Sequence, residues 1–339
     1  MTDLQYFIEL FSAGKNLPAA EAEACFDAIQ NEDNETRLAS LLKTWGEKGP
    51  NADELYSLAG IMRNRAVRVN SQHEVFVDAV GTGGSRAKRF NVSTAAAFVI
   101  AGAGVPVAKH GNRAATSSSG SADVLSELGV NILADPQRAE DCLNNIGICF
   151  MFAPKFHCLS PTLGKVRREL GVPTIFNNLG PLCNPAGAPH QLIGVWDKDR
   201  VTITADALCR LGTKRSWIVH GEDGLDEITL NGKTIIAEIT GGNVRELEIS
   251  PVDFGVETAS LNGYSRLTAV ESASLISKIL EGKFTGLPEE NIVLINAAAP
   301  IYLAGGAESL PLAFAEAQES IRSGSARSKL EALINGTKR

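Results

Sequence analysis

The sequence predicts an α/β protein in which a small helical domain precedes a large domain with a mixed, mainly parallel sheet flanked by helices. Residues 1–70 show only the helical spacing of apolar residues. From residue 75 onward, β-branched segments of strand length alternate with helical segments, which is typical of a sheet covered on both faces. We place the domains at 1–70, joined by helices near residues 160–183, and at 71–339.

The composition excludes several classes of protein. The 339-residue chain has 44% hydrophobic residues, 21% charged residues and a formal net charge of −7. Nucleic-acid-binding proteins usually carry a basic surplus, so we expect no nucleic-acid partner. The apolar run Ala95–Ala108 is too short to span a bilayer, and the N-terminal MTDLQYFIEL lacks signal-peptide features. None of the six cysteines forms a C-x-x-C pair, so we expect reduced thiols, a cytoplasmic location and no membrane partner.

Four short helices are expected in the N-terminal domain. Apolar residues at positions 4, 7, 8 and 11 share one helical face. Pro18 suits the first turn of a second helix, Leu38–Trp45 mark a third, and Asn51 can cap a fourth. These helices have more apolar surface than they can bury alone, so we expect them to form an oligomer contact as well.

The next element joins a strand to a helix through glycines. The apolar run Phe76–Val80 ends in Gly81-Thr82-Gly83-Gly84, and Ser93-Thr94 stand where they could cap a helix that begins at Ala95. A strand, a glycine turn and a helix N-terminus together present backbone N–H groups to an anion. A tight turn alone would explain the glycines, but the following Asn91, Ser93 and Thr94 favour a phosphate site.

A second polar segment follows soon afterwards. Val105–Ala108 resembles a strand, Lys109–Arg113 a polar loop, and Thr116–Ser121 is a run of hydroxyls before another helix. Lys109 and Arg113 suit a diphosphate or a carboxylate, although a solvated loop would also contain such cations. His110 alone is more often a packed residue than a catalyst. Two anion-binding loops within about 40 residues suggest a ligand with two phosphate groups.

The remaining chain continues the alternation. We expect helices at Pro136–Ile146, Pro161–Leu170 and Val201–Leu211, strands at Cys149–Phe152, Gln191–Trp196 and Ser216–His220, and mostly helices over 269–335. Asn231-Gly232, between Ile228–Leu230 and Thr234–Ile239, predicts a β-hairpin. Gly180–Pro185 is punctuated by proline and glycine and is a candidate hinge between the domains.

Two further pairs of charged residues are candidates for a site. Asp226-Glu227 follow a predicted strand and a glycine-containing loop, and adjacent carboxylates suit Mg²⁺, which prefers oxygen ligands that it shares with phosphates. A solvated acidic loop would have the same spacing. Arg167-Arg168 lie on a predicted helix, where they are either surface charge or a clamp for an aromatic carboxylate.

These segments together resemble the anthranilate phosphoribosyltransferase family, whose members join anthranilate to phosphoribosyl diphosphate (PRPP). The resemblance covers nearly the whole chain, and the combination of KHGNR…GSAD with FN-x-LGPL-x-NP is highly specific. It is carried by Gly81–Gly84, Asn91–Thr94, Lys109–Arg113, Gly120–Asp123, Phe152-Ala153-Pro154 with His157, Thr174–Asn177, Leu179–Leu182, Asn184-Pro185 and Asp226-Glu227.

The resemblance implies a fold shared with nucleoside phosphorylases, a homodimer formed through the helical domain, and a bound Mg²⁺. It also implies a set of contacts for each ligand. PRPP would contact Gly81, Gly84, Asn91, Val92, Ser93, Thr94, Lys109, His110, Gly111, Asn112, Arg113, Ala114, Ala115, Thr116, Ser117 and Ser121. Anthranilate would contact Gly81, Asn112 and Arg167, and Mg²⁺ would be held by Ser93, Asp226 and Glu227.

The transfer implied by this family replaces diphosphate at C1 of PRPP with the amino group of anthranilate. An aromatic amine is neutral and nucleophilic near pH 7, so we expect no side chain to act as acid or base. Electrostatic stabilisation of the departing diphosphate and positioning of the two substrates should supply the rate acceleration.

Three positions depart from the family pattern: Ser85 stands in place of the usual Asp, Arg89 in place of Thr, and Pro173 in place of a common Arg. The first two changes add positive character to the glycine loop. We therefore expect Ser85 and Arg89 to contact PRPP, with Arg89 on a phosphate and less dependence on a second Mg²⁺. The departures leave open an alternative, a related phosphoribosyltransferase or nucleoside phosphorylase-like paralogue with a different aromatic acceptor. The intact Asp226-Glu227 pair disfavours a non-enzyme paralogue.

Overall fold

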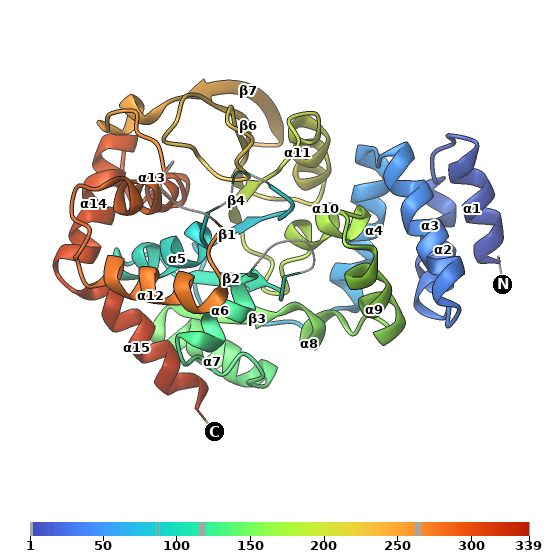
Figure 1. Ribbon diagram of the computed structural model, residues 1–339, viewed down its shortest axis with the longest axis horizontal. Helices are drawn as coiled ribbons and strands as arrows, with labels where there is room; N and C mark the ends of the chain where they lie inside the picture. Colours follow the sequence, from blue (N-terminus) through green and yellow to red (C-terminus); the bar gives the residue numbers. More distant parts are fainter. Residues whose placement is uncertain (1–2, 86, 88, 115–118, 262–265, 339) are drawn as a thin grey trace.

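The computed structural model describes residues 3–85, 87, 89–114, 119–261 and 266–338. These residues form an α/β structure with a seven-stranded mixed sheet, so the predicted fold class is confirmed. The N-terminal helices form a group at one end of the molecule, while the C-terminal helices pack against the sheet at the opposite end (Figure 1).

Four helices open the chain, and we call them the helical unit. They are α1 (Leu4–Ser12), α2 (Ala22–Gln30), α3 (Glu35–Lys48) and α4 (Ala52–Arg65). Polar residues begin three of them: Asp3 and Asn34 accept backbone N–H groups of the first turn, and Asn51 forms a capping box with Glu54. The apolar faces of all four meet in one core around Trp45, as their helical spacing predicts.

The sheet has the strand order β3-β2-β1-β4-β5-β6-β7. Its strands are β1 (Val77–Gly81), β2 (Val107–Gly111), β3 (Ile148–Phe152), β4 (His190–Gly194), β5 (Arg215–Gly221), β6 (Thr234–Thr240) and β7 (Asn243–Ile249). The first five strands in this order, from β3 to β5, run parallel to one another. Strand β6 pairs antiparallel with β5, and β7 pairs antiparallel with β6. The order reverses direction at β1, because β2 and β3 lie on one side of it and β4 on the other. Ligands of such sheets bind beyond the carboxyl ends of the strands at this reversal.

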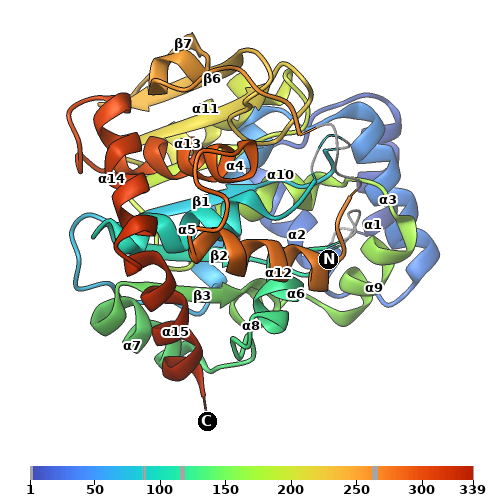
Figure 2. The same cartoon turned by 60° about the vertical axis from the view of Figure 1, so that its left-hand side comes forward.

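Helices cover both faces of the sheet (Figure 1; Figure 2). The further helices are α5 (Val92–Gly102), α6 (Ser121–Glu127), α7 (Pro136–Ile146), α8 (Ala153–His157), α9 (Pro161–Leu170), α10 (Ile175–Leu182), α11 (Arg200–Arg210), α12 (Ala269–Leu280), α13 (Pro288–Leu303), α14 (Leu310–Arg322) and α15 (Ser325–Thr337). One apolar core joins the sheet to α5 and α12–α15. A second core joins the other face to α9, α10, α11 and the helical unit. The domain boundary at residue 70 stays a prediction.

Predicted element bounds near the glycine loop need correction. Helix α5 begins at Val92, so Ser93 and Thr94 lie inside its first turn instead of capping it. The reason is that the Asn91 carbonyl already accepts the N–H groups of Thr94 and Ala95. Strand β2 extends to Gly111, so Lys109 and His110 are strand residues and not loop residues, since they pair with β3 along its whole length.

Two more predictions were wrong in detail. Pro18 precedes a 3₁₀ turn at Ala19–Glu21, and α2 starts only at Ala22, because the Glu21 N–H turns back to the Pro18 carbonyl. The hairpin is β6–β7, turning at Gly241-Gly242, and not one at Asn231-Gly232. The backbone of Ile228 takes its hydrogen bonds from an Asn side chain of α13, which leaves it no strand partner.

The segment predicted as a hinge is mostly helical and buried. Gly180–Leu182 form the last residues of α10, and Cys183, Asn184 and Pro185 are buried behind them. Gln191 of β4 donates to the Pro181 carbonyl at 3.2 Å, which fixes this end of the helix to the sheet.

Within the described part of the chain, every helix is too short or too polar to cross a membrane. The six cysteines are free thiols, of which Cys25, Cys142, Cys149 and Cys183 are buried. Burial raises the pKa of the Cys183 thiol to about 12, so this thiol is protonated near neutral pH.

Candidate active site

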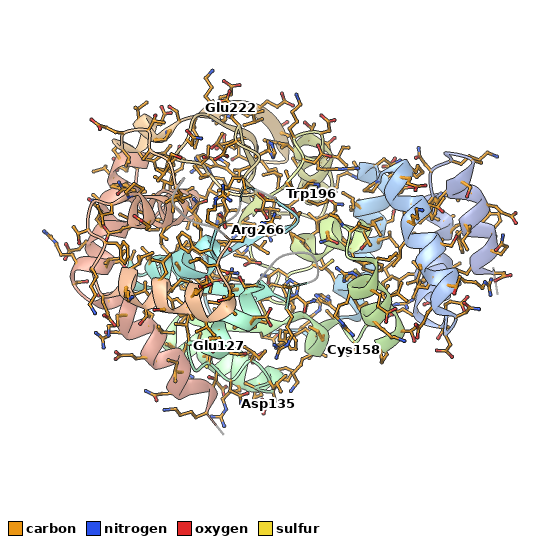
Figure 3. All side chains as sticks on the ribbon, in the orientation of Figure 1. Glu127, Asp135, Cys158, Trp196, Glu222 and Arg266 are labelled. Carbon is orange, nitrogen blue, oxygen red and sulfur yellow. The ribbon has the colours of Figure 1, made fainter. Side chains whose placement is uncertain are left out.

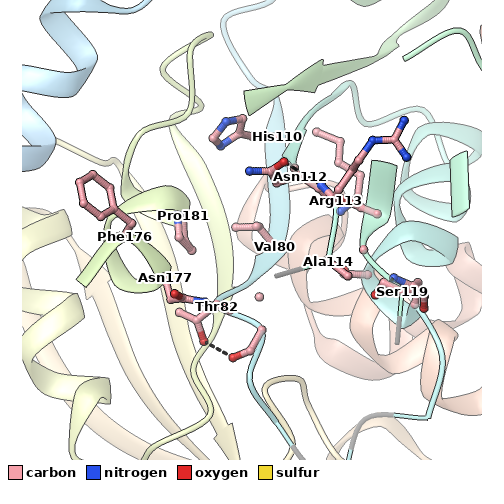
Figure 4. A pocket seen from close by; sticks show the side chains of 18 of the residues that line it. Val80, Thr82, His110, Asn112, Arg113, Ala114, Ser119, Phe176, Asn177 and Pro181 are labelled. Atoms are coloured by element: carbon pink, nitrogen blue, oxygen red, sulfur yellow. Dashed lines mark hydrogen bonds between the residues drawn. The ribbon is translucent and has the colours of Figure 1, made fainter. Parts of the chain in front are cut away.

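A cleft of about 170 Å³ lies beyond the carboxyl ends of β1 and β2, bordered by α9 and α10 (Figure 4). Its position is the strand-order reversal described above. Most of the residues predicted to bind substrate line it: Gly81, Asn91, Ser93, Lys109, His110, Gly111, Asn112, Arg113, Ala114, Ser121 and Arg167. Val80, Thr82, Gly83, Ser119, Gly120, Phe176, Asn177 and Pro181 complete the lining.

The glycine loop forms the lip of the cleft. Gly83 and Gly84 have φ angles of 68° and 87°, which side-chain-bearing residues rarely adopt. The Gly83 N–H donates to Asp226 Oδ2 at 3.0 Å. Ser85 Oγ donates to the Gly224 carbonyl at 2.7 Å. The loop is therefore tied at two points to the segment that carries the acidic pair.

The acidic pair Asp226-Glu227 is buried directly behind this loop. Glu227 Oε1 accepts the Ser93 N–H of the first turn of α5 at 3.3 Å, where the helix dipole favours negative charge. Asp226 Oδ1 is buried and has no hydrogen-bond partner among the described residues. A buried carboxylate oxygen without a partner is costly unless a cation or water satisfies it. Asp226, Glu227 and the Ser93 hydroxyl thus offer the oxygen ligands that suit Mg²⁺.

Close backbone contact brings the acidic pair to this place. Gly81 ends β1 and Gly194 ends β4, and the two residues are paired in the sheet. A Cβ atom on Gly194 would lie 1.7 Å from the Asp226 carbonyl oxygen, and one on Gly81 would lie 2.7 Å from Asp226 Oδ2. Gly194 was not among the predicted site residues, because it lies inside the expected strand Gln191–Trp196 and gave no sign of a strand end.

The start of α5 is held by a small polar network. Asn91 Oδ1 accepts from Ser119 Oγ at 2.8 Å and from Ser272 Oγ at 3.0 Å, and the Asn91 N–H contacts Ser272 Oγ at 3.2 Å. Ser272 is fully buried on α12, 181 positions away along the chain from Asn91. It gave no sequence signal, because a serine in an apolar helix is common. The network fixes both anion-binding segments relative to each other.

Lys109 is buried at the floor of the cleft, where its Nζ donates to the Ala79 carbonyl at 2.7 Å. The neighbouring Asp78 is fully buried and accepts from Asn184 Nδ2 at 2.7 Å and from the His110 N–H at 3.3 Å. Burial raises the pKa of Asp78 to about 6, and the charge of Lys109 opposes this rise. The positive charge of the buried Lys109 is thus partly balanced by Asp78 inside the sheet.

His110 and His157 form a buried pair with their Nε2 atoms 3.1 Å apart and their rings edge to face. One nitrogen must donate and the other accept, so a second proton on the pair would place two donors against each other. Burial lowers the pKa of His157 to about 4 and holds that of His110 well below its usual range. Both imidazoles are therefore neutral near pH 7 and work as packed, hydrogen-bonding groups.

Arg167 lies at the opposite wall of the cleft, with its guanidinium carbon 5.2 Å from the centre of the Phe176 ring. Burial lowers its pKa to about 10, which leaves it charged near neutral pH. Arg168, the next residue on α9, is exposed. The structure therefore separates the two arginines that the sequence left undecided: Arg167 faces the cleft and Arg168 faces solvent.

Several predicted residues do not line the cleft. Ser85 is buried against Gly224, and Val92 and Thr94 are buried in the first turn of α5. Gly84 lies against Pro173 and Trp196, which would be 3.3 and 3.6 Å from a Cβ atom at this position. Ala115, Thr116 and Ser117 lie outside the described residues.

Two of the predicted cations have other neighbours in the structure. Arg89 borders a neighbouring cavity of about 120 Å³ with Asp223 and Leu261 instead of the cleft, because its backbone carbonyl is held by the Leu267 N–H. Among the described residues, Arg266 reaches the end of the glycine loop, where its Nη2 donates to the Ser85 carbonyl at 3.1 Å (Figure 3). Arg113 lines the cleft but forms an ion pair with Asp123 at 2.7 Å.

The fold and this cleft define a glycosyl transferase of the α/β type. The sequence pattern described as "Glycosyl transferase family, a/b domain" matches residues 73–327. An anthranilate phosphoribosyltransferase from Moorella thermoacetica is 44% identical over 323 residues, which cover 95% of each chain. One from Haloarcula marismortui is 42% identical and is matched over 98% of this chain and 99% of its own. The chain belongs to the anthranilate phosphoribosyltransferase family, which confirms the resemblance found in the sequence.

Solved structures agree with this membership. The anthranilate phosphoribosyltransferase from Thermus thermophilus superposes with a TM-score of 0.88 at 36% identity, over 98% of this chain and 99% of that one. The Saccharomyces cerevisiae enzyme in complex with PRPP and Mg gives a TM-score of 0.88 at 28% identity, over 98% and 97% of the chains. The same yeast enzyme with 4-fluoroanthranilate gives a TM-score of 0.86 at 26% identity, over the same shares of the chains.

The histidine pair predicts a pH dependence of stability. The pKa of His157 falls from 6.5 to about 4 on folding, so its contribution to stability is present above pH 6.5 and is lost as the pH falls toward 4. We expect His157→Gln to flatten this loss, by about 3 kcal/mol at most. Urea unfolding of both proteins across this range measures the difference. An equal slope for the two proteins would contradict the assignment.

Proposed function

We propose that the protein transfers the 5-phosphoribosyl group of PRPP to the amino group of anthranilate and releases diphosphate, a step of tryptophan biosynthesis. One observation carries this proposal: a single cleft has the glycine loop and the Lys109–Ala114 segment on one wall and an arginine over an aromatic ring on the other, and a buried acidic pair lies directly behind the first wall. Family membership over nearly the whole chain supports the same reaction.

We assign PRPP to the side of the cleft formed by β1, β2 and α5. The glycine loop, the first turn of α5 and the Lys109–Ala114 segment meet there. A glycine-rich turn and a helix N-terminus favour phosphate oxygens. The Lys109 ammonium, buried beneath this wall, adds fixed positive charge where the departing diphosphate becomes more negative.

We assign Mg²⁺ to the oxygens of Ser93, Asp226 and Glu227. The unpartnered Asp226 Oδ1 supports this choice. The bound ion would neutralise part of the diphosphate charge. The chain's own contribution is to hold Asp226 through the Gly83 N–H and Glu227 through the Ser93 N–H.

Anthranilate is assigned to the wall formed by α9 and α10. Its carboxylate suits the Arg167 guanidinium, and its ring suits the neighbouring Phe176 and Pro181. Burial lowers the pKa of both histidines at the cleft edge, which makes them weak bases and fits an amine that needs no base. Asn177 Nδ2 donates to the Thr82 carbonyl at 3.2 Å and so links the two walls.

We also propose that the protein is a cytoplasmic homodimer formed through the helical unit. Tyr6 and Tyr56 keep 41% and 36% of their surface exposed on that unit, and free thiols suit a reducing compartment. Light scattering of the purified protein should give twice the mass of one chain.

The reaction is tested by incubating the protein with PRPP, Mg²⁺ and a panel of aromatic amines and nucleobases while diphosphate is measured. We expect release with anthranilate and little release with the other acceptors. Release only with a different acceptor would replace anthranilate, and phosphate-dependent cleavage of a nucleoside would indicate a phosphorylase.

Arg167→Ala is expected to raise the KM for anthranilate about tenfold, because a charged hydrogen bond to the carboxylate is lost. The KM for PRPP should change little. Arg168→Ala, which removes an exposed arginine from the same helix, is the matched control and should behave like the wild type. Equal effects of Arg167→Ala on both substrates would place this side chain outside the acceptor site.

Asp226→Asn is expected to raise the Mg²⁺ concentration for half-maximal activity by about tenfold or more. The amide oxygen can still accept from Gly83, so the melting temperature should stay close to that of the wild type. Glu222→Gln removes an exposed charge just upstream (Figure 3) and controls for general electrostatics. An unchanged Mg²⁺ requirement in Asp226→Asn would refute the metal assignment.

A further inference from the structure

Asn296 is a polar residue in the middle of helix α13, in the apolar stretch that follows the polar first turn, and this helix packs against the sheet. It is only 2% exposed, and its neighbours Ile295, Ala297 and Ala298 are fully buried. Burying an amide in such surroundings is costly unless its donors and its acceptor are satisfied. All of them are: Oδ1 accepts one backbone N–H, and Nδ2 donates to two carbonyls.

Two of these hydrogen bonds go to a single residue, Ile228. Asn296 Oδ1 accepts the Ile228 N–H at 2.9 Å, and Asn296 Nδ2 donates to the Ile228 carbonyl at 2.8 Å. The side-chain amide thereby takes the place of a neighbouring strand. The third bond, from Nδ2 to the Ile292 carbonyl at 2.9 Å, ties the amide to its own helix and fixes its orientation.

Ile228 directly follows Glu227, so its N–H belongs to the peptide bond that joins it to the acidic pair. On the other side of the pair, the Asp226 backbone passes over the end of β4 with no room for a side chain at Gly194. The backbone of the acidic pair is thus held from both sides, by Gly194 before it and by Asn296 after it. The side-chain bonds from Gly83 and Ser93 then select the direction of each carboxylate.

We propose that Asn296 is a positioning residue for Mg²⁺: by holding Ile228, it sets where the Asp226 and Glu227 carboxylates lie. This role rests on the metal assignment made above. Asn296 touches neither substrate nor the ion, and it acts only through the backbone that carries the two carboxylates. Partners of this kind commonly change metal affinity when they are replaced.

The chemistry explains why an asparagine stands here. The site needs one acceptor for the Ile228 N–H and one donor for the Ile228 carbonyl. Aspartate has no donor when ionised, and leucine has neither group, whereas serine can serve only one of the two. Glutamine retains both groups on a longer stem, so it can satisfy Ile228 only by displacing it.

The test measures PRPP binding by calorimetry over a series of Mg²⁺ concentrations, with the full-length protein and no acceptor. We expect Asn296→Asp to raise the Mg²⁺ concentration for half-maximal PRPP binding by about tenfold or more. PRPP affinity at saturating Mg²⁺ should stay close to that of the wild type. Asn296→Ser should give an intermediate shift, and it keeps the proposal testable if the aspartate variant fails to fold.

Ser320→Ala is the control for destabilisation alone. Ser320 is buried on α14 in the same apolar core, and its Oγ donates to the Val99 carbonyl at 2.7 Å. Its loss should lower the melting temperature without changing the Mg²⁺ requirement. A purely structural role for Asn296 predicts the same behaviour for the Asn296 variants.

The outcomes distinguish a failure of the metal assignment from a failure of the positioning role. If wild-type PRPP binding is the same with and without Mg²⁺, the metal assignment fails, and the role of Asn296 fails with it. If the wild type depends on Mg²⁺ but the folded Asn296 variants have an unchanged half-saturating concentration, only the positioning role is overturned.

Discussion

The contact between the acidic segment and the ends of two strands is the constraint on which the cleft depends. The Asp226 backbone crosses β1 and β4 where both strands end in glycine, and its carboxylate accepts the Gly83 N–H. This crossing fixes the glycine loop, brings Glu227 to the first turn of α5, and requires Ile228 to find its hydrogen bonds outside the sheet. Parts of the chain that are far apart in sequence can therefore meet at one point, because Gly81 and Gly194 have no side chains.

Several ionisable side chains are buried beneath the cleft and are held there by hydrogen bonds. Lys109, Asp78 and His110 lie on strands of the sheet, His157 lies on α8, and all four side chains are buried. Their hydrogen bonds place the Lys109 ammonium close to the proposed diphosphate and neutral imidazoles close to the proposed acceptor. Groups fixed in this way need little reorganisation when charge moves during a reaction.

The sequence was sufficient for the fold class, for the order of most elements and for the family, because strand–glycine–helix patterns are local and the motifs are long. It was insufficient wherever a partner lies far along the chain. Ser272 and Asn296 look like ordinary helix residues until the structure places them on Asn91 and Ile228. The Asn231-Gly232 hairpin was wrong for the same reason: a side chain from α13 replaced the expected strand. Arg89 lines a neighbouring cavity, and the direction of its loop could not be read from charge. The binding roles themselves stay predictions.

The two apolar cores have a mechanical consequence. One core, shared by α5, α12–α15 and one face of the sheet, supports the glycine loop and the start of α5. The other runs from the helical unit through α9 and α10, so Phe176 and the helix that carries Arg167 belong to it. The proposed PRPP wall and the proposed anthranilate wall are thus supported by different cores, which pack on opposite faces of one sheet. The hydrogen bond from Gln191 to the Pro181 carbonyl fixes α10 to that sheet. The sheet that both cores share therefore sets the distance between the two walls.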